Sequence, residues 1–566
     1  MSEMILPGVY IEVRPEALII PGRVSVNNVG IVGTASRGPV DTPTLLATYS
    51  QAREIFGEYD AWNERNPDPN ALSLVRALEL AFRHGATTVY AVRIASGGAA
   101  AGFALNSGGN PNVTLRANSP GTWGNEIEIL VTKAEAGDTS FIEAEKHPGD
   151  APIALKYPIA RSARNRVTVL NPATGRVTPF EVFYEDDPAP TAGQVRIDTA
   201  AKTLEFFAAE APNAADQVVT VSYVVPSANS RKVTLKLGTM QEVYVVASGE
   251  DLARDINANS ALVTVPEGDL GAGAADLPDL STDPAKFELF GSGTNPRGNN
   301  GAGVGSTDFE AGFSQLLNEN VHILVAAGQS HHEIGDELAA HVAAASNDEN
   351  KRERIGIVGS ALTDTFDDIR GHNLNSDRVV FVAPGIVASD AVLRKDVTLP
   401  GSYAAAAIAG LMSSYDPHVS LTNKPLPVAG LQRKYTNPDL KVLLEEGRVF
   451  ALQEKLGFKV VRGITTSTNT AWKQITTRRI VDYAKFGVRS AADPYIGMLN
   501  NERVRGALRA TINSFLTEMV EDEMLIGYDL NVSATREQER QGICVVTMVV
   551  RPVFSIDFIK VTMFLE

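Results

Sequence analysis

Four segments between residues 321 and 387 decide the fold: VHILVAAG (321–328), HHEIGDELAAHVAAA (331–345), RIGIVGSA (354–361) and RVVFVAPGIV (378–387). The first, third and fourth are near-continuous apolar runs rich in Val and Ile, and the second is predicted to be a helix. Apolar strands that alternate with helices are typical of a parallel or mixed sheet that is buried on both faces. The sequence therefore predicts an α/β core with flanking helices.

The same alternation occurs near the start of the chain, in VGIVGT (29–34), a predicted helix over 71–84 and TTVYAVRI (87–94). Between these blocks the pattern changes to short period-two segments separated by turns, which indicates inserted β structure. We expect the core at 27–103 and 287–540, a first inserted domain at 104–145 and 230–286, and a second β insert nested at 146–229. An N-terminal arm with its tether (1–26) and a C-terminal arm (541–566) complete the expected organisation.

Composition excludes several classes of protein. The 566 residues include 51 Lys and Arg against 67 Asp and Glu, a net charge of −16, which disfavours nucleic-acid binding. The sequence has neither a signal-peptide pattern nor an apolar run of the ~18 residues that span a bilayer, so we expect a soluble protein without membrane insertion. The single cysteine, Cys544, lies in an apolar strand pattern and is expected to be a buried, inert thiol.

Two motifs suggest chemistry, and each has a structural explanation. The Gly-rich run 291–306 lacks the spacing of a phosphate-binding loop. In HHEIGDELAAH (331–341), Asp336 stands where a zinc-protease helix needs its second histidine, whereas Ser330 and Glu333 form a capping-box pattern. We therefore predict no catalytic, cofactor-binding or metal-binding residue.

Both ends of the sequence have strand patterns. Val9, Ile11 and Val13 form one apolar face near the start, and Phe554, Ile556 and Phe558 form another near the end. A polar stretch, ATREQERQG (534–542), is expected to tether the second end. Neither end has an adjacent hairpin turn, so we predict inter-subunit arms that add strands to a neighbour's sheet. Pairing of both ends within their own subunit is the alternative.

A basic segment, residues 467–490, stands out in this acidic protein. It contains Lys473, Arg478, Arg479, Lys485 and Arg489, opposed only by Asp482. Either a solvated helix face or a docking surface for an acidic partner explains this pattern.

Four stretches carry a resemblance to a known family: PGVYIEV (7–13), GIVGTASRGPVDTPTLL (30–46), SPGTWGNEIEI (119–129) and LPGSYAAAAIAGLMSSYDPHVSLTNKPL (399–426). In this order they resemble the contractile tail sheath proteins of phages, which are related to the sheaths of other contractile injection systems. The nested insert at 146–229 is the part least tied to that family, and we expect it to be an accessory decoration.

The resemblance implies a non-enzymatic subunit of the virion tail, assembled in the host cytoplasm without cofactors. Such subunits form stacked hexameric rings around a tail tube and, on a baseplate trigger, contract to drive the tube through the target cell envelope. The implied partners are further copies of the chain, the tail tube protein, and baseplate and tail-end terminator proteins. The resemblance also implies that Lys473, Arg478, Arg479 and Lys485 face the tube. The alternatives are a nucleotide-dependent α/β enzyme with a β insert and another virion structural protein.

Overall fold

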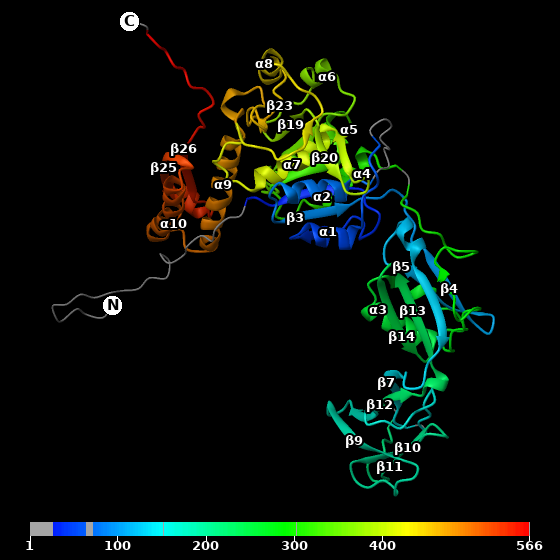
Figure 1. Ribbon diagram of the computed structural model, residues 1–566. Helices are drawn as coiled ribbons and strands as arrows, with labels where there is room; N and C mark the ends of the chain where they lie inside the picture. The colour runs from blue at the N-terminus through cyan, green and yellow to red at the C-terminus, as the bar shows by residue number, and fades with distance from the viewer. Residues whose placement is uncertain (1–25, 64–71, 151, 215, 302, 565–566) are drawn as a thin grey trace, which may run out of the picture. The chain divides into compact units, whose positions relative to one another are not determined.

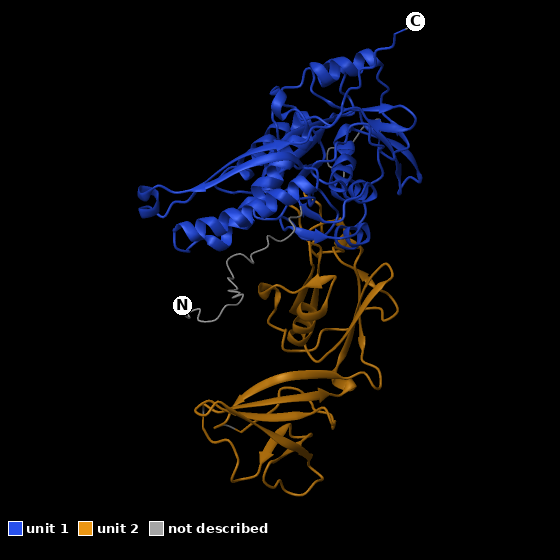
Figure 2. Cartoon of the chain, turned by 90° about the vertical axis from the view of Figure 1, so that its left-hand side faces the viewer, with its two compact units in different colours: residues 1–96, 302–566 blue, residues 97–301 orange. Residues whose placement is uncertain are grey.

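The computed structural model describes residues 26–63, 72–150, 152–214, 216–301 and 303–564. The chain divides into two compact units, one comprising residues 1–96 and 302–566 and the other comprising residues 97–301 (Figure 2). The second unit is thus an insertion in the sequence of the first.

An eight-stranded sheet forms the centre of the first unit, in the order β2-β3-β1-β17-β18-β19-β23-β24 (Figure 1). The central strands run parallel, and the two edge strands are antiparallel to their neighbours. The strands are β1 (Val29–Gly33), β2 (Thr44–Leu46), β3 (Val89–Arg93), β17 (Ile323–Ser330), β18 (Ile355–Gly359), β19 (Val379–Ala383), β23 (Phe450–Glu454) and β24 (Phe458–Val460). This sheet confirms the predicted mixed α/β class.

Helices cover both faces of this sheet. Successive residues of β1 point to opposite faces of the sheet. Ile31 belongs to the apolar core beneath the first group of helices, and Val32 belongs to the core beneath the second group. The first group is α1 (Tyr49–Phe56), α2 (Leu74–Arg83) and α7 (Gly401–Ser413); the second is α4 (Ser306–Gln315), α5 (His331–Ala345), α6 (Phe366–Arg370) and α8 (Asn437–Glu445). A smaller sheet, in the order β21-β20-β22, consists of β20 (Ile386–Asp390), β21 (Lys395–Leu399) and β22 (Gly430–Leu431).

Helix α7 is buried along its whole length, which explains its Ala-rich sequence. Small side chains let it lie close to both the sheet and α2. The helix lies close to α2 at Gly410, where a Cβ atom would collide with the main-chain oxygen of Ala81.

The second unit contains three sheets. Two of them share an apolar core with α3 (Gly249–Asn259). Their strands are β4 (Gly102–Ser107), β5 (Asn110–Ala117) and β15 (Val263–Thr264) in one, and β6 (Glu128–Lys133), β13 (Arg231–Leu237), β14 (Met240–Val246) and β16 (Glu288–Leu289) in the other.

The third sheet has six strands and an apolar core of its own. Its strands are β7 (Ser140–Pro148), β8 (Arg166–Asn171), β9 (Arg176–Tyr184), β10 (Gln194–Asp198), β11 (Thr203–Phe206) and β12 (Val218–Val225). The boundary expected at residue 146 therefore falls inside β7, which pairs with β12.

After the core, the first unit continues with α9 (Ile475–Ala492), α10 (Glu502–Glu521), β25 (Leu525–Ser533), α11 (Arg536–Arg540) and β26 (Val545–Pro552). The apolar stripe of α10 packs into a separate cluster with α9 and β25. Within the described ranges no helix is long and apolar enough to cross a membrane.

Two expectations about single motifs have clear outcomes. The capping box is confirmed, because the carboxylate of Glu333 accepts a hydrogen bond of 2.7 Å from the main-chain N–H of Ser330. The expectation for Cys544 is wrong, since its thiol is exposed. Cys544 directly precedes β26, at the end of a turn, and so is not enclosed by the strand pairing.

Substituting Gly410 with alanine tests the close packing of α7. Gly→Ala in a helix usually stabilises a protein by about 0.5–1 kcal/mol, and we expect this gain for Gly506→Ala in α10, where space is open. For Gly410→Ala we expect the opposite sign, a loss of about 2 kcal/mol, because the methyl group overlaps the backbone of α2. Chemical denaturation of both variants measures the two values, and stabilisation by Gly410→Ala would contradict this packing.

Excision of residues 140–225 tests whether the six-stranded sheet is dispensable for folding. Ser140 and Val225 are paired residues of neighbouring strands, so a short Gly/Ser bridge can join Thr139 to Pro226 without strain. We expect the shortened chain to express in folded form and to keep the thermal transition of the first unit. Aggregation with several bridge lengths would count against this expectation.

Candidate functional site

The basic segment (467–490), the N-terminal arm (1–26) and the C-terminal arm (541–566) are the regions for which the sequence predicted partners. Of the arm residues near the start, Val9, Ile11 and Val13 lie outside the described residues. The other predicted site residues belong to the first unit, where α9 and the strands around it position them.

Arg478 lies in the first turns of α9 and is buried among charged partners. Its guanidinium bonds Asp377 at 2.8 Å and Asp482 at 3.0 Å and stacks over the ring of Trp472. Asp482 also accepts two hydrogen bonds, of 2.7 and 2.9 Å, from Arg378 at the start of β19. Asp482 is therefore shared by two arginines and joins α9 to the central sheet.

Arg479 is also buried but has neutral partners. It donates hydrogen bonds to Asn27 Oδ1 at 2.8 Å and to the main-chain oxygens of Tyr415, at 2.9 Å, and Asp416, at 3.4 Å. Burial lowers the pKa of Arg479 to about 10. Arg479 thus lies just beyond the C-terminal end of α7, where the negative end of the helix dipole favours a cation.

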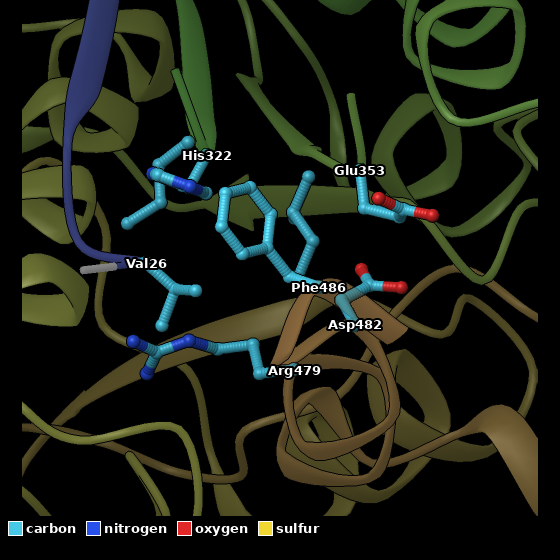
Figure 3. Close-up of a pocket in the computed structure, with 8 residues that line it drawn as sticks. Val26, His322, Glu353, Arg479, Asp482 and Phe486 are labelled. Carbon is cyan, nitrogen blue, oxygen red and sulfur yellow. The ribbon is translucent and has the colours of Figure 1, made fainter. Parts of the chain in front are cut away.

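A small cavity of about 20 Å³ lies between Arg479 and the carboxylates of Glu353 and Asp482. Figure 3 shows the Arg479 guanidinium beside Val26 on one side, and the carboxylates of Asp482 and Glu353 on the other, with the Phe486 ring between them. The carboxylates and the Arg479 cation thus lie around one small enclosed space.

Glu353 is the acidic partner of the second half of α9. It is buried, and it pairs with Lys485 Nζ at 2.8 Å and with Arg489. Burial acts to raise the pKa of Glu353, but the hydrogen bonds from Arg489 and Lys485 outweigh it and lower the pKa to about 2. Lys473, which precedes α9, is half-buried, and burial together with Arg462 lowers its pKa.

The structure therefore does not bring the four basic residues to one solvated face. Arg478, Arg479 and Lys485 each contact a different group within the chain. Their acidic and carbonyl partners come from positions 377, 415 and 353, which no local sequence pattern could have revealed. The segment attaches α9 to the core, and a role toward a tube stays a prediction.

The strand predicted near the C-terminus is only partly unpaired. β26 forms an antiparallel hairpin with β25, so the expectation of no local partner strand is wrong for residues 545–552. The stretch 534–542, expected to be a tether, contains α11 and forms the hairpin tip. The period-two pattern LIGYDLNVS (525–533) is the signal that could have identified the partner strand.

Beyond β26, residues 553–564 form neither helix nor strand. Phe554, Ile556 and Phe558 are 59%, 81% and 81% exposed. Further exposed apolar side chains follow at Ile559, Val561, Met563 and Phe564. Exposed apolar surface of this extent is rare on a monomeric protein and indicates an interaction site.

Asp557 holds this segment against its own subunit, and the sequence analysis missed it. Its carboxylate, only 6% exposed, accepts hydrogen bonds from Arg462 Nε at 2.7 Å, Gln474 Nε2 at 3.1 Å and Thr422 Oγ1 at 3.2 Å. The Arg462 guanidinium also lies over the Phe558 ring. A single acidic residue inside an apolar run was the available signal.

Gly298, in the Gly-rich run 291–306, has a structural role within the second unit. Asn125 Nδ2 donates a hydrogen bond of 2.8 Å to the oxygen of Gly298, and Asn125 Oδ1 accepts one of 2.9 Å from its nitrogen. A Cβ at Gly298 would collide with the main-chain oxygen of Gly121. Close backbone packing thus accounts for Gly298, one of the glycines that had suggested a nucleotide loop.

Glu353→Gln tests the attachment of α9. Removing the buried carboxylate leaves Lys485 and Arg489 without their partner, so we expect a loss of about 3 kcal/mol in unfolding free energy at pH 7. Because the folded-state pKa is below the ordinary value of 4.5, the stabilisation is present above about pH 4.5 and is lost as the pH falls toward 2. The difference in unfolding free energy between Glu353→Gln and wild type, measured by urea titration, should narrow over that pH range. Substitution of the exposed Glu349 with Gln should leave the unfolding free energy equal to that of wild type throughout.

Comparisons with known proteins agree with this architecture. Residues 302–466 match the phage tail sheath protein central domain, and residues 467–566 match the phage tail sheath C-terminal domain. No curated protein matches the sequence.

Among solved structures, a sheath tail protein from Desulfitobacterium hafniense is similar over 96% of this chain and 100% of its own, with 12% identity and a TM-score of 0.56. A sheath tail protein from Listeria innocua is similar over 95% of both chains, with 14% identity and a TM-score of 0.58. These likenesses concern the fold, and the two consecutive domain matches identify residues 302–566 as the central and C-terminal domains of a phage tail sheath protein.

Proposed function

We propose that this sheath protein is a non-enzymatic structural subunit that polymerises as stacked hexameric rings around a tail tube. On contraction the assembly drives the tube through the target cell envelope. The subunit would be assembled in the host cytoplasm and reside in the virion tail. The tail sheath domains at 302–566 support this proposal, as does the exposed apolar segment that follows β26.

The observation that carries the proposal is an alternation of exposure along residues 553–558. Val553, Ser555 and Asp557 are partly buried against their own subunit, and the residues between them are exposed. This is the period-two pattern of a strand whose outer face lacks a partner among the described residues. We infer that Phe554, Ile556 and Phe558 dock on a neighbouring subunit.

The hairpin β25–β26 is a suitable acceptor for such a strand. It is a two-stranded sheet, so each strand has an edge that no described strand covers. Open edges pair readily with an added strand, and the exposed Ile526 and Val549 offer apolar contacts beside them. Burying three large apolar side chains contributes roughly 4.5–9 kcal/mol before the entropy of ordering is subtracted, at about 1.5–3 kcal/mol each.

The N-terminal residues Val9, Ile11 and Val13 belong to the same proposal as a second donated strand. Their alternation in the sequence supports this role.

The tail tube, baseplate and tail-end terminator proteins are the further partners in this proposal. For the tube, we keep the basic segment as the facing surface, with Lys473 and Lys485 as its least buried members. Arg478→Glu would be a poor test of tube binding, because it would place a third carboxylate beside Asp377 and Asp482 and so destabilise the fold.

The double variant Phe554→Asp with Ile556→Asp tests the donated strand. It keeps Asp557, Phe558 and their contacts with Arg462, so we expect a melting temperature within a few degrees of wild type. Two charges on the outer face should abolish docking, and the variant should stay monomeric at concentrations where the wild type forms tubular polymers. Analytical ultracentrifugation and electron microscopy measure both properties.

Leu456→Asp is the control, because Leu456 is also a highly exposed apolar residue but lies in the turn between β23 and β24. This control should polymerise like wild type. Normal polymers from the double variant, or a loss of polymers in both variants, would contradict the proposed role of residues 554–558.

A further inference from the structure

Two histidines and an aspartate meet where α5 begins. His331 and His332 are the first residues of that helix, and Asp364 lies in the loop before α6. Asp364 Oδ1 is 3.1 Å from His332 Nε2, and Asp364 Oδ2 is 3.6 Å from His331 Nδ1. One potential ligand atom from each residue lies within 4.8 Å of the other two.

These separations match the spacing of atoms that share a tetrahedral metal ion. Zinc bonds nitrogen and oxygen ligands at about 2.0–2.1 Å, which sets the ligands about 3.4 Å apart at a tetrahedral angle. The measured values of 3.1 and 3.6 Å fall on either side of this spacing and run to the two different oxygens of Asp364. The three side chains are therefore close enough to share one ion after a rotation of the carboxylate.

His331 supplies an independent observation, because its polar atoms lack hydrogen bonds. The residue is only 8% exposed, and neither ring nitrogen has a hydrogen-bond partner among the described residues. Buried polar atoms are nearly always satisfied, so an orphaned imidazole beside a carboxylate indicates a missing ligand.

The neighbouring groups leave this carboxylate available. Arg433 donates its hydrogen bond to the main-chain oxygen of Asp364, at 3.3 Å, and the N–H of Ala361 holds Asp364 Oδ2 in place at 2.8 Å. A fixed second contact of this kind orients a metal ligand.

His372 lines the same cavity but does not supply a fourth ligand, because both of its ring nitrogens are engaged. One contacts the oxygen of Gly447, and the other accepts from the N–H of Leu374 at 3.1 Å. His331 and His332 instead line an open cavity of about 310 Å³, together with Asp336, Asp367 and Asp368. The acidic lining attracts cations, and the cavity gives the fourth position to solvent.

We propose that His331, His332 and Asp364 form a binding site for one divalent transition-metal ion of the zinc type. Two imidazoles and one carboxylate suit such an ion, whereas Mg²⁺ and Ca²⁺ require a shell of oxygen atoms. Helix α5 supplies only two of the three ligands, because Asp364 lies 32 positions after His332 in the sequence. The bound ion would tie the start of α5 to the loop that precedes α6.

Zinc titration of the full-length chain, after treatment with a chelator, tests the site. Isothermal titration calorimetry should give one Zn²⁺ per chain at this site, unaffected by excess Mg²⁺, and Co²⁺ should show the visible absorption of a low-coordinate site. His332→Gln and Asp364→Asn should each weaken Zn²⁺ binding by about 100-fold and abolish the Co²⁺ spectrum. His332 is 55% exposed, so its substitution spares the fold.

His147→Gln is the matched control, because His147 also contacts a carboxylate, that of Glu145 at 2.9 Å, but the described residues offer no third ligand there. This variant should bind Zn²⁺ as tightly as wild type. Absence of Zn²⁺ binding, or equal binding by the His332 and Asp364 variants, would overturn the proposal and leave a hydrogen-bonded His332–Asp364 pair. Because the readout is metal binding, it is independent of whether the chain polymerises.

Discussion

The carboxylate of Asp482, shared between Arg378 and Arg478, is the contact on which the arrangement of the first unit depends. The C-terminal helices and hairpin have an apolar core of their own, and buried ion pairs join this part to the central sheet. Glu353, with Lys485 and Arg489, makes a second attachment of the same kind. Such groups stabilise a structure only while every member is paired, because an unpaired buried charge costs several kcal/mol.

This mode of attachment suits a subunit that must move as a body. Apolar surfaces can slide against each other at little cost in free energy. A hydrogen-bonded ion pair, in contrast, fixes both the distance and the direction between its two partners. Buried pairs are also screened little by salt. The orientation of α9 on the sheet can therefore persist while contacts between subunits are exchanged, as the proposed contraction requires.

Local patterns predicted the elements that depend on local sequence. The helix over 331–345 and its capping box follow from Ser330, Glu333 and the flanking apolar strands. The apolar stripe of α10 likewise follows from helical spacing. Periodicity could not show that Arg478 and Arg479 are buried, because their partners come from distant positions such as Asp377 and Tyr415. The same reason explains why the proximity of Asp364 to His332, and of Asp557 to Arg462, became visible only in three dimensions.

The anchoring of Asp557 has a consequence for the uniformity of an assembly. In an extended segment a slip of one residue exchanges the two faces, and a slip of two would set Ser555 or Ile559, which lack a carboxylate, against Arg462. One buried carboxylate thus fixes the register of the whole segment on its subunit. Phe554, Ile556 and Phe558 then occupy the same positions on every copy of the subunit. A regular assembly needs this, because all of its contacts between subunits must be equivalent.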